Sequence, residues 1–209
     1  MRARSILAVL AVVALVAAPA ASATTKKKPA PKPVKKYCNL VTDESGDGAW
    51  SLNPAVKTGG LDIIGADFAS GPKTLVAVLK LSDTDFSPSH DPWASTLIYQ
   101  YTLGATSNFG QDYEFRAGLS FLTGKVTGTA SVGGTGVALK SFTVDRTHNT
   151  FTWVLDRTVD KTLTRKGTIF KEFRGQSAAN GDSADQAPNQ MPHPPTSYPD
   201  RAPSCIVAK

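Results

Sequence analysis

Hydrophobic and polar residues alternate along most of the chain between positions 61 and 174. In the clearest run, Leu75 and Leu79 have one parity and Lys80 has the other. A period of two residues is typical of β-strands that bury one face and expose the other. The same period recurs in three further runs, 97–103, 113–121 and 151–155.

Turn-forming residues separate these runs at intervals of roughly ten residues, which is typical of all-β sandwiches and barrels. Two examples are the segments 107–110 and 133–136. The parity changes between Val137 and Phe142, which predicts a β-bulge. A short helical turn is predicted only near 158–163. We therefore predict a single antiparallel β-sandwich of the jelly-roll kind, in the all-β class.

The first 23 residues have the three parts of a signal peptide. Arg2 and Arg4 precede an apolar run, 6–18, and small residues at 21–23 form a cleavage signal. The run is too short to span a membrane, and no later stretch reaches the roughly 20 apolar residues of a transmembrane helix. We therefore predict that 1–23 is a signal peptide. The mature protein is expected to be secreted, extracellular or associated with the cell wall, with no membrane span.

Residues 24–36 form a lysine- and proline-rich segment without a hydrophobic period. This composition predicts an extended, disordered spacer. The chain has 23 basic against 17 acidic side chains, and the spacer and signal peptide account for the excess. The folded part is slightly acidic, which excludes a basic nucleic-acid-binding domain. The spacer either binds polyanions of the cell envelope or acts as a solubilising linker.

The folded domain is expected to span 37–207 and to end in an irregular segment, 175–207, without strands of its own. Cys38 and Cys205 bracket almost all of this domain, and export places them in an oxidising compartment. The even cysteine count favours a disulfide between them, which would tie the C-terminal segment to the first strand. Free or intermolecular thiols are the alternative.

Four aspartates near the start of the domain are candidate calcium ligands. Asp43 and Asp47 lie in a glycine-containing loop, and Asp62 and Asp67 follow it. Ca²⁺ takes six to eight oxygen ligands and tolerates irregular geometry. The spacing does not match an EF-hand loop, and turns with Asx hydrogen bonds are the alternative. If the C-terminal segment folds back, the further candidate ligands are Asp182 and Asp185.

Trp50 and Trp93 lie in segments rich in turn-forming residues, whereas Trp153 has the parity of a buried face. An exposed indole ring offers a flat apolar face on which a sugar ring can stack. Large aromatic residues in loops also cap the open ends of sandwiches. The two loop tryptophans are therefore either ligand-stacking residues or caps of the core.

Two groups of residues raise the question of catalysis. Asp112 and Glu114 share one strand face, about 6.5 to 7 Å apart, a separation compatible with the acid and base of glycoside hydrolysis. Arg116 continues that face, so a ladder of solvated charges is the alternative. The segment 89–91 has the residue types of a Ser-His-Asp triad, but three neighbours in one loop cannot each reach the next. No catalytic residue is assigned.

Five short motifs are distributed along the mature chain: Cys38-Asn39-Leu40-Val41-Thr42-Asp43, Leu61-Asp62-Ile63-Ile64-Gly65-Ala66-Asp67, Lys73-Thr74-Leu75, Asp182-Ser183-Ala184 and Ser204-Cys205. Together with Gly46-Asp47, they resemble a family of secreted actinobacterial proteins with no assigned activity. The Gly-Asp turn and the Leu-Asp-Ile strand are also distantly similar to DOMON-like and family-nine-type carbohydrate-binding β-sandwiches. That resemblance implies a β-sandwich whose relatives bind sugars or other ligands, sometimes with calcium. It implies no catalytic residue in this chain.

The sequence therefore predicts a secreted, non-enzymatic, monomeric β-sandwich that binds an extracellular or cell-envelope ligand, with a glycan as the favoured class. Trp50 and Trp93 are the candidate stacking residues. One alternative is an envelope-associated interaction or structural protein held by its basic spacer. Another is a small glycoside hydrolase that uses Asp112 and Glu114.

Overall fold

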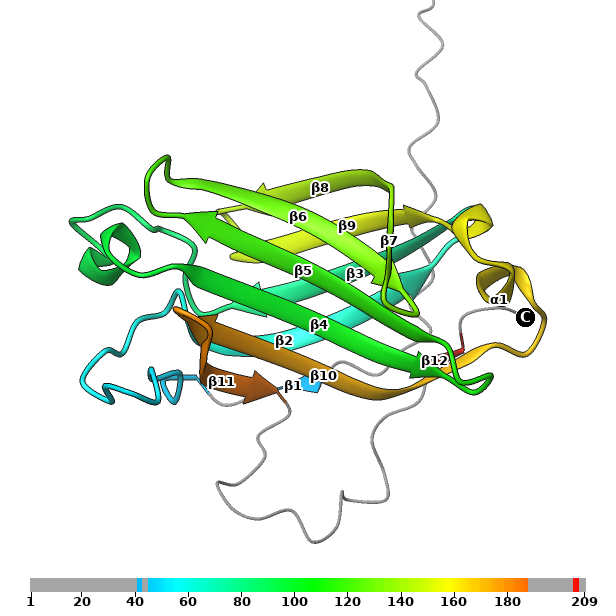
Figure 1. Ribbon diagram of the computed structural model, residues 1–209, viewed down its shortest axis with the longest axis horizontal. Helices are drawn as coiled ribbons and strands as arrows, with labels where there is room; N and C mark the ends of the chain where they lie inside the picture. The colour runs from blue at the N-terminus through cyan, green and yellow to red at the C-terminus, as the bar shows by residue number, and fades with distance from the viewer. Residues whose placement is uncertain (1–40, 43–44, 188–204, 207–209) are drawn as a thin grey trace, which may run out of the picture. The chain divides into compact units, whose positions relative to one another are not determined.

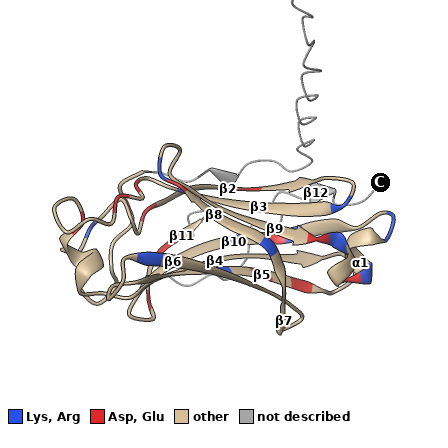
Figure 2. Cartoon of the chain, turned by 90° about the horizontal axis from the view of Figure 1, so that it is seen from above, with Lys and Arg blue, Asp and Glu red and all other residues tan. Residues whose placement is uncertain are grey.

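The computed structural model describes residues 41–42, 45–187 and 205–206, and these form a sandwich of two antiparallel β-sheets. Figure 1 shows the sheets one behind the other, and Figure 2 shows the same two layers from above. The all-β sandwich predicted from the alternating pattern is therefore confirmed.

One layer is a five-stranded sheet with the strand order β1-β2-β3-β9-β8. Its strands in chain order are β1 (Val41–Thr42), β2 (Ile63–Ser70), β3 (Thr74–Leu81), β8 (Leu139–Asp145) and β9 (Thr150–Asp156).

The other layer has seven strands, in which β11-β10-β4-β5-β6-β7 follow one another and β12 pairs with β10. Its strands in chain order are β4 (Tyr99–Ser107), β5 (Asp112–Ser120), β6 (Lys125–Val132), β7 (Thr135–Val137), β10 (Ile169–Ala179), β11 (Asp182–Ala187) and β12 (Cys205–Ile206). Three short helical turns complete the described part: η1 (Pro92–Ser95), η2 (Arg157–Val159) and α1 (Lys161–Thr164).

Aromatic side chains from both sheets meet in the core. Phe68 on β2 packs against Phe115 on β5 and Phe170 on β10, with ring centroids 5.8 and 5.5 Å apart. Trp153 on β9 is fully buried, and its Nε1 donates to the backbone oxygen of Arg116 at 3.0 Å. Trp153 thus contacts both layers. Its buried indole N–H has a hydrogen-bond partner, so burying this polar group does not destabilise the fold.

Two finer predictions are also confirmed. The register of β8 against β9 shifts between Leu139 and Ser141, which is the bulge that the change of parity predicted. The expected helical turn is present as η2 and α1, and the side chain of Asp160 caps α1 by accepting from the backbone N of Thr162 at 3.2 Å.

The prediction that residues from Gly175 onward lack strands is wrong for the described part. Strand β10 continues to Ala179 between β4 and β11, and β11 runs to Ala187. The turn between them is Asn180-Gly181, with φ of 51° and 89°. Asn-Gly is the preferred pair for a two-residue hairpin because both positions need positive φ. The residues of the hairpin are mostly small and pack closely. The sequence therefore lacks the alternation of large apolar side chains that would predict these strands.

Several predictions concern residues outside the described ranges. These are the signal peptide (1–23), the spacer (24–36), Cys38 and Asp43. The disulfide therefore stays a prediction, although β12 places the backbone of Cys205 opposite Phe170 on β10. Within the part of the chain that is described, no helix is both long enough and apolar enough to cross a membrane.

Candidate functional site

Three loops meet at one end of the sandwich, drawn at the left of Figure 1. They are the loop before β2 (45–62), the β3–β4 connection (82–98) and the β5–β6 hairpin turn (121–124). The strand ends that carry them are paired: Ile63 lies opposite Leu81, and Tyr99 lies opposite Leu119. We call this end of the molecule the loop end.

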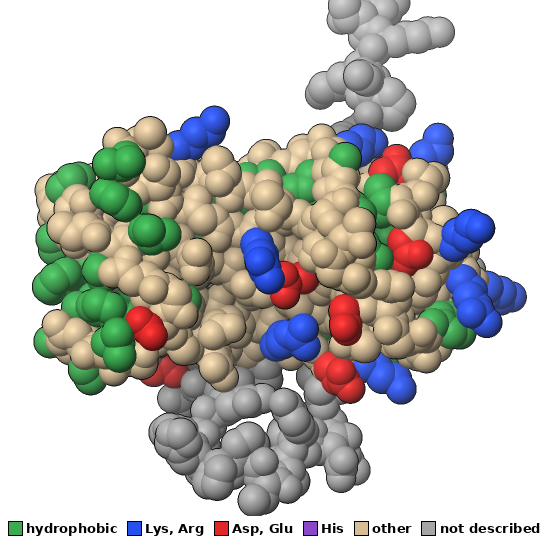
Figure 3. Space-filling model, in the orientation of Figure 1, with side chains coloured by type: hydrophobic (Ala, Val, Ile, Leu, Met, Phe, Trp, Pro, Cys, Tyr) green, Lys and Arg blue, Asp and Glu red, His purple; other side chains and the backbone are tan. Residues whose placement is uncertain are grey.

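Large hydrophobic side chains are exposed mainly at the loop end, and Figure 3 shows them gathered at its left. They are Leu52, Trp93, Ile98, Phe121 and Leu122. Phe109, in the β4–β5 turn at the other end, has the guanidinium of Arg165 lying 3.7 Å from its ring centroid. Because gathered apolar side chains on a surface often mark interaction sites, the loop end is the candidate binding end.

A depression of about 280 Å³ lies between two of these loops. Residues 57–60 form one wall, and Asp83, Asp85 and residues 90–93 form the other. Trp93 is among the lining residues and is 37% exposed. The lining thus combines one aromatic ring with hydroxyl, carboxylate, imidazole and ammonium groups.

Asp91 holds Trp93 in place. Its Oδ1 accepts from the backbone N of Trp93 and Ala94 at 3.2 Å each, and so caps η1. The same carboxylate accepts from the hydroxyl of Tyr99 at 3.0 Å and from Thr58 Oγ1 at 2.6 Å. Asp91 is only 3% exposed. Its bonds join both walls of the depression to the core strand β4.

Two buried tyrosines that bond to lining residues of the depression act as hydrogen-bond donors and not as acids. Burial raises the pKa of Tyr99, and the nearby charge of Asp91 raises it further. Burial also raises the pKa of Tyr101 well above its ordinary value, and its hydroxyl donates to the backbone oxygen of Gly60 at 2.7 Å. Neutral tyrosine hydroxyls therefore hold Asp91 and Gly60, two residues that line the depression.

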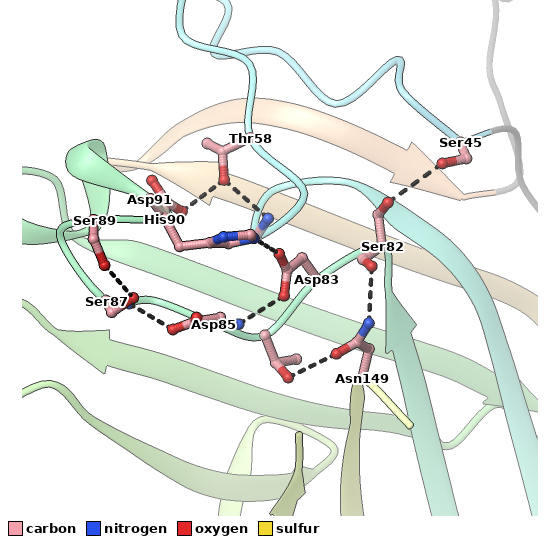
Figure 4. Close-up of polar contacts among 12 residues, drawn as sticks. Ser45, Thr58, Ser82, Asp83, Asp85, Ser87, Ser89, His90, Asp91 and Asn149 are labelled. Atoms are coloured by element: carbon pink, nitrogen blue, oxygen red, sulfur yellow. Dashed lines mark hydrogen bonds and ion pairs between the residues drawn. The ribbon is translucent and has the colours of Figure 1, made fainter. Parts of the chain in front are cut away.

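The acidic wall is built from consecutive turns, shown in Figure 4. The backbone N of Asp85 donates to Asp83 Oδ1 at 2.8 Å, and the backbone N of Ser87 donates to Asp85 Oδ1 at 3.0 Å. Hydrogen bonds from Ser87 hold the pKa of Asp85 below its usual range, so this exposed carboxylate is ionised at neutral pH. The His90 ring pairs with Asp83, whereas the next residue, Asp91, is buried and caps η1.

Trp50 does not line this depression. It is half-buried and packs against the core, as the capping alternative predicts. Its Nε1 is buried and has no hydrogen-bond partner among the described residues. Of the two tryptophans that the sequence offers for stacking, only Trp93 lines the depression.

The structure brings together part of the predicted calcium set. One carboxylate oxygen each from Asp47, Asp62 and Asp185 lies within 4.8 Å of the other two, and we call this group the acidic cluster. Asp67 lies five positions further along the chain than Asp62, about 16 Å away along the strand, and is not part of the group. Asp43 lies outside the described residues.

Asp112 and Glu114 make ordinary surface contacts. Thr106 Oγ1 donates to Asp112 Oδ1 at 2.7 Å, and Glu114 forms an ion pair with Arg116. Both contacts fit the ladder of solvated charges, and the pair of catalytic carboxylates stays an untested prediction.

A second hollow, of about 420 Å³, lies on the outer face of the seven-stranded sheet. Side chains such as Gln100, Thr102, Arg116 and Thr129 line it, and Tyr101 contributes to it while its own ring is buried in the core. This hollow offers hydrogen-bonding groups without an exposed aromatic ring. The alternation of the strands places these residues on the outer face, but nothing in the sequence distinguishes them from other solvated residues.

Comparisons of the chain with models of protein families, with curated proteins and with solved structures find no match.

Proposed function

We propose that this chain is an exported, non-enzymatic β-sandwich that binds a glycan in the depression beside Trp93. One observation carries the proposal: Trp93, 37% exposed and with its backbone N bonded to Asp91, lines a polar depression at the end of the molecule where other apolar side chains are also exposed. Export is supported by the predicted signal peptide.

The chemistry of the depression suits a sugar ring. A pyranose has an apolar C–H face that stacks on an aromatic ring, and hydroxyl groups at its edge that need hydrogen-bond partners. Trp93 supplies the aromatic face. The ionised carboxylate of Asp85 can accept from sugar hydroxyls, and the ammonium of Lys57 can donate to them.

The charge of the lining favours a neutral glycan over a polyanion. Asp83 and Asp85 contribute carboxylates that reach the surface, Asp91 contributes a buried one, and Lys57 and His90 are the basic side chains among the lining residues. An anionic polymer would be repelled by this wall, because opposed potentials are required across a charged interface. Association with wall polyanions would then depend on the lysine-rich spacer and not on this site.

Affinity electrophoresis and calorimetry against a panel of neutral and acidic polysaccharides test the proposal. We expect retention by at least one neutral glycan. In Trp93→Ala the affinity should fall roughly 10- to 100-fold, because a central aromatic contact typically contributes about 2 kcal/mol to binding. Asp85→Asn should weaken binding by a few fold, since one charge-assisted hydrogen bond is lost.

Phe109→Ala is the matched control. Phe109 is 38% exposed, nearly the same as Trp93, but it lies at the opposite end of the sandwich. Its substitution should leave glycan affinity unchanged. Failure of every neutral glycan to bind, or equal affinity in Trp93→Ala and the wild type, would overturn the proposal.

A further inference from the structure

The acidic cluster gathers carboxylates from three separate segments. Asp47 lies in the loop before β2, Asp62 directly precedes β2, and Asp185 lies in β11. Asp62 and Asp185 are 2% and 7% exposed, whereas Asp47 is exposed. Two buried carboxylates and a third from solvent therefore converge on one point.

One oxygen of Asp62 has no hydrogen-bond partner among the residues that the structure describes. Its Oδ2 accepts from the backbone N of Gly46 at 2.8 Å and from Ser45 Oγ at 3.3 Å. Its Oδ1 is buried and has no hydrogen-bond partner, and no ion pair neutralises Asp62 within the described ranges. An unpartnered oxygen of a buried carboxylate is costly, especially beside two other carboxylates.

The backbone is arranged to hold these carboxylates together. Gly46 has a φ of 93°, and a Cβ on Gly48 would lie 2.6 Å from the Cα of Asp62. Asp47 is therefore held against Asp62 by a loop that only glycine permits on both sides. Asp185 is oriented in turn, because its Oδ2 accepts from the backbone N of Ile63 at 2.6 Å.

Further backbone bonds join the loop to β11. The N of Ala49 donates to the O of Ala184 at 2.9 Å, and the N of Ser51 donates to the O of Ser183 at 3.1 Å. The cluster is thus a junction of elements that are distant in sequence and are already fixed by main-chain bonds. Such a frame lowers the ordering cost of binding an ion there.

We propose that the acidic cluster binds one calcium ion through Asp47, Asp62 and Asp185. Carboxylate oxygens are hard ligands, and the exposed side at Asp47 admits the water that completes the coordination sphere. Calcium is favoured over magnesium because the three carboxylates come from irregular segments, and Mg²⁺ requires near-ideal octahedral geometry. The ion would pin the β10–β11 hairpin to the beginning of β2, a role independent of glycan binding.

Calorimetry and thermal unfolding of the purified mature protein test this site. Calcium is titrated up to about 10 mM after treatment with a chelator, since extracellular calcium modules bind with dissociation constants of about 0.1 to 1 mM. We expect saturable binding of one ion. At about 10 mM calcium the unfolding midpoint should rise by about 5 to 10 °C if the dissociation constant is about 0.1 mM, by about half as much if it is about 1 mM, and less with magnesium.

Asp62→Asn should abolish both the heat of binding and the shift. Asp47→Ala is a second variant that keeps the test interpretable, because Asp47 is exposed and its loss should not prevent folding. Asp182→Asn is the matched control, since Asp182 lies on the same strand but not in the cluster, and it should respond to calcium as the wild type does. Absence of binding in the wild type, or an undiminished shift in both cluster variants, would overturn the proposal.

Discussion

Two buried aspartates, Asp91 and Asp62, have nearly the same exposure and opposite surroundings. Asp91 is 3% exposed and accepts four hydrogen bonds, from two backbone N–H groups and two hydroxyls. Asp62 is 2% exposed, and one of its oxygens accepts two bonds while the other accepts none.

The difference separates a carboxylate that completes the fold from one that is incomplete without a ligand. Burying a carboxylate is favourable only when its oxygens are satisfied. At Asp91 the protein supplies every partner, so this residue needs no ion. At Asp62 two other carboxylates lie within 4.8 Å, which is an arrangement that a cation stabilises.

The largest expected effect is at Asp91. Asp91→Ala leaves the hydroxyls of Tyr99 and Thr58 and the N-terminal N–H groups of η1 without their acceptor. We expect a loss of about 3 to 5 kcal/mol in the free energy of unfolding, measured by denaturant titration. Asp85→Ala, an exposed neighbour in the same connection, should cost about 0.5 kcal/mol or less. A similar small cost for both variants would show that Asp91 does not support the fold.

Thr58→Val tests one of the four hydrogen bonds to Asp91, the one donated by the Thr58 hydroxyl. The substitution keeps the shape of the side chain but removes the hydroxyl that donates to Asp91 and accepts from the backbone N of Gly60 at 2.9 Å. We expect a loss of about 1 to 2 kcal/mol, because the buried N–H of Gly60 also loses its partner. Thr106→Val, at an exposed hydrogen bond to Asp112, should change stability by less than about 0.5 kcal/mol.

Tyr99→Phe tests the hydrogen bond that the Tyr99 hydroxyl donates to Asp91, and its effect on stability should depend on pH. At neutral pH the lost bond to Asp91 should cost about 1 kcal/mol. An unfolded tyrosine ionises near pH 10, whereas burial raises the pKa of Tyr99 in the folded protein. The folded state then retains a proton that the unfolded chain releases, so the contribution of Tyr99 is lost as the pH rises above about 10. The difference in stability between wild type and Tyr99→Phe should therefore shrink between about pH 8 and about pH 11. A constant difference would contradict the raised pKa.

The parts of the fold that the sequence predicts are those in which large side chains mark the buried face. The alternation around Leu75, Tyr113 and Trp153 identifies strands because each of these residues is buried between the sheets. The β10–β11 hairpin was missed because its buried residues are small, such as Ser177 and Ala179. The Asn180-Gly181 turn was the available signal.

The sequence predicts the parts of the candidate sites that local segments form, and it does not predict the parts that long-range contacts bring together. Asp47 and Asp62 are predicted because they are close in sequence, and their loop is bent by glycine. Asp185 is named from the sequence only on the condition that the C-terminal segment folds back, because the β10–β11 pairing and the bonds from β11 to the loop are long-range contacts that a local pattern does not contain. Asp67 and Asp62 are near in sequence but separate in space, because an extended strand advances about 3.3 Å per residue.

The smallest change in the free energy of unfolding is expected for a substitution of Asp62 in the absence of calcium. Asp62→Asn keeps an oxygen that can accept from Gly46 and removes one negative charge from the acidic cluster. In chelator we therefore expect this variant to unfold within about 0.5 kcal/mol of the wild type, or to be slightly more stable, because like-charge repulsion is relieved. Asp91→Asn, the same isosteric change at a satisfied carboxylate, should remain destabilising with or without calcium. If Asp62→Asn were as destabilising as Asp91→Asn in chelator, the carboxylate of Asp62 would be a structural group like that of Asp91, and the contrast between them would fail. If instead the free energy of unfolding of the wild type exceeds that of Asp62→Asn only when calcium is present, then the unpaired oxygen is a ligand atom and not a defect of packing.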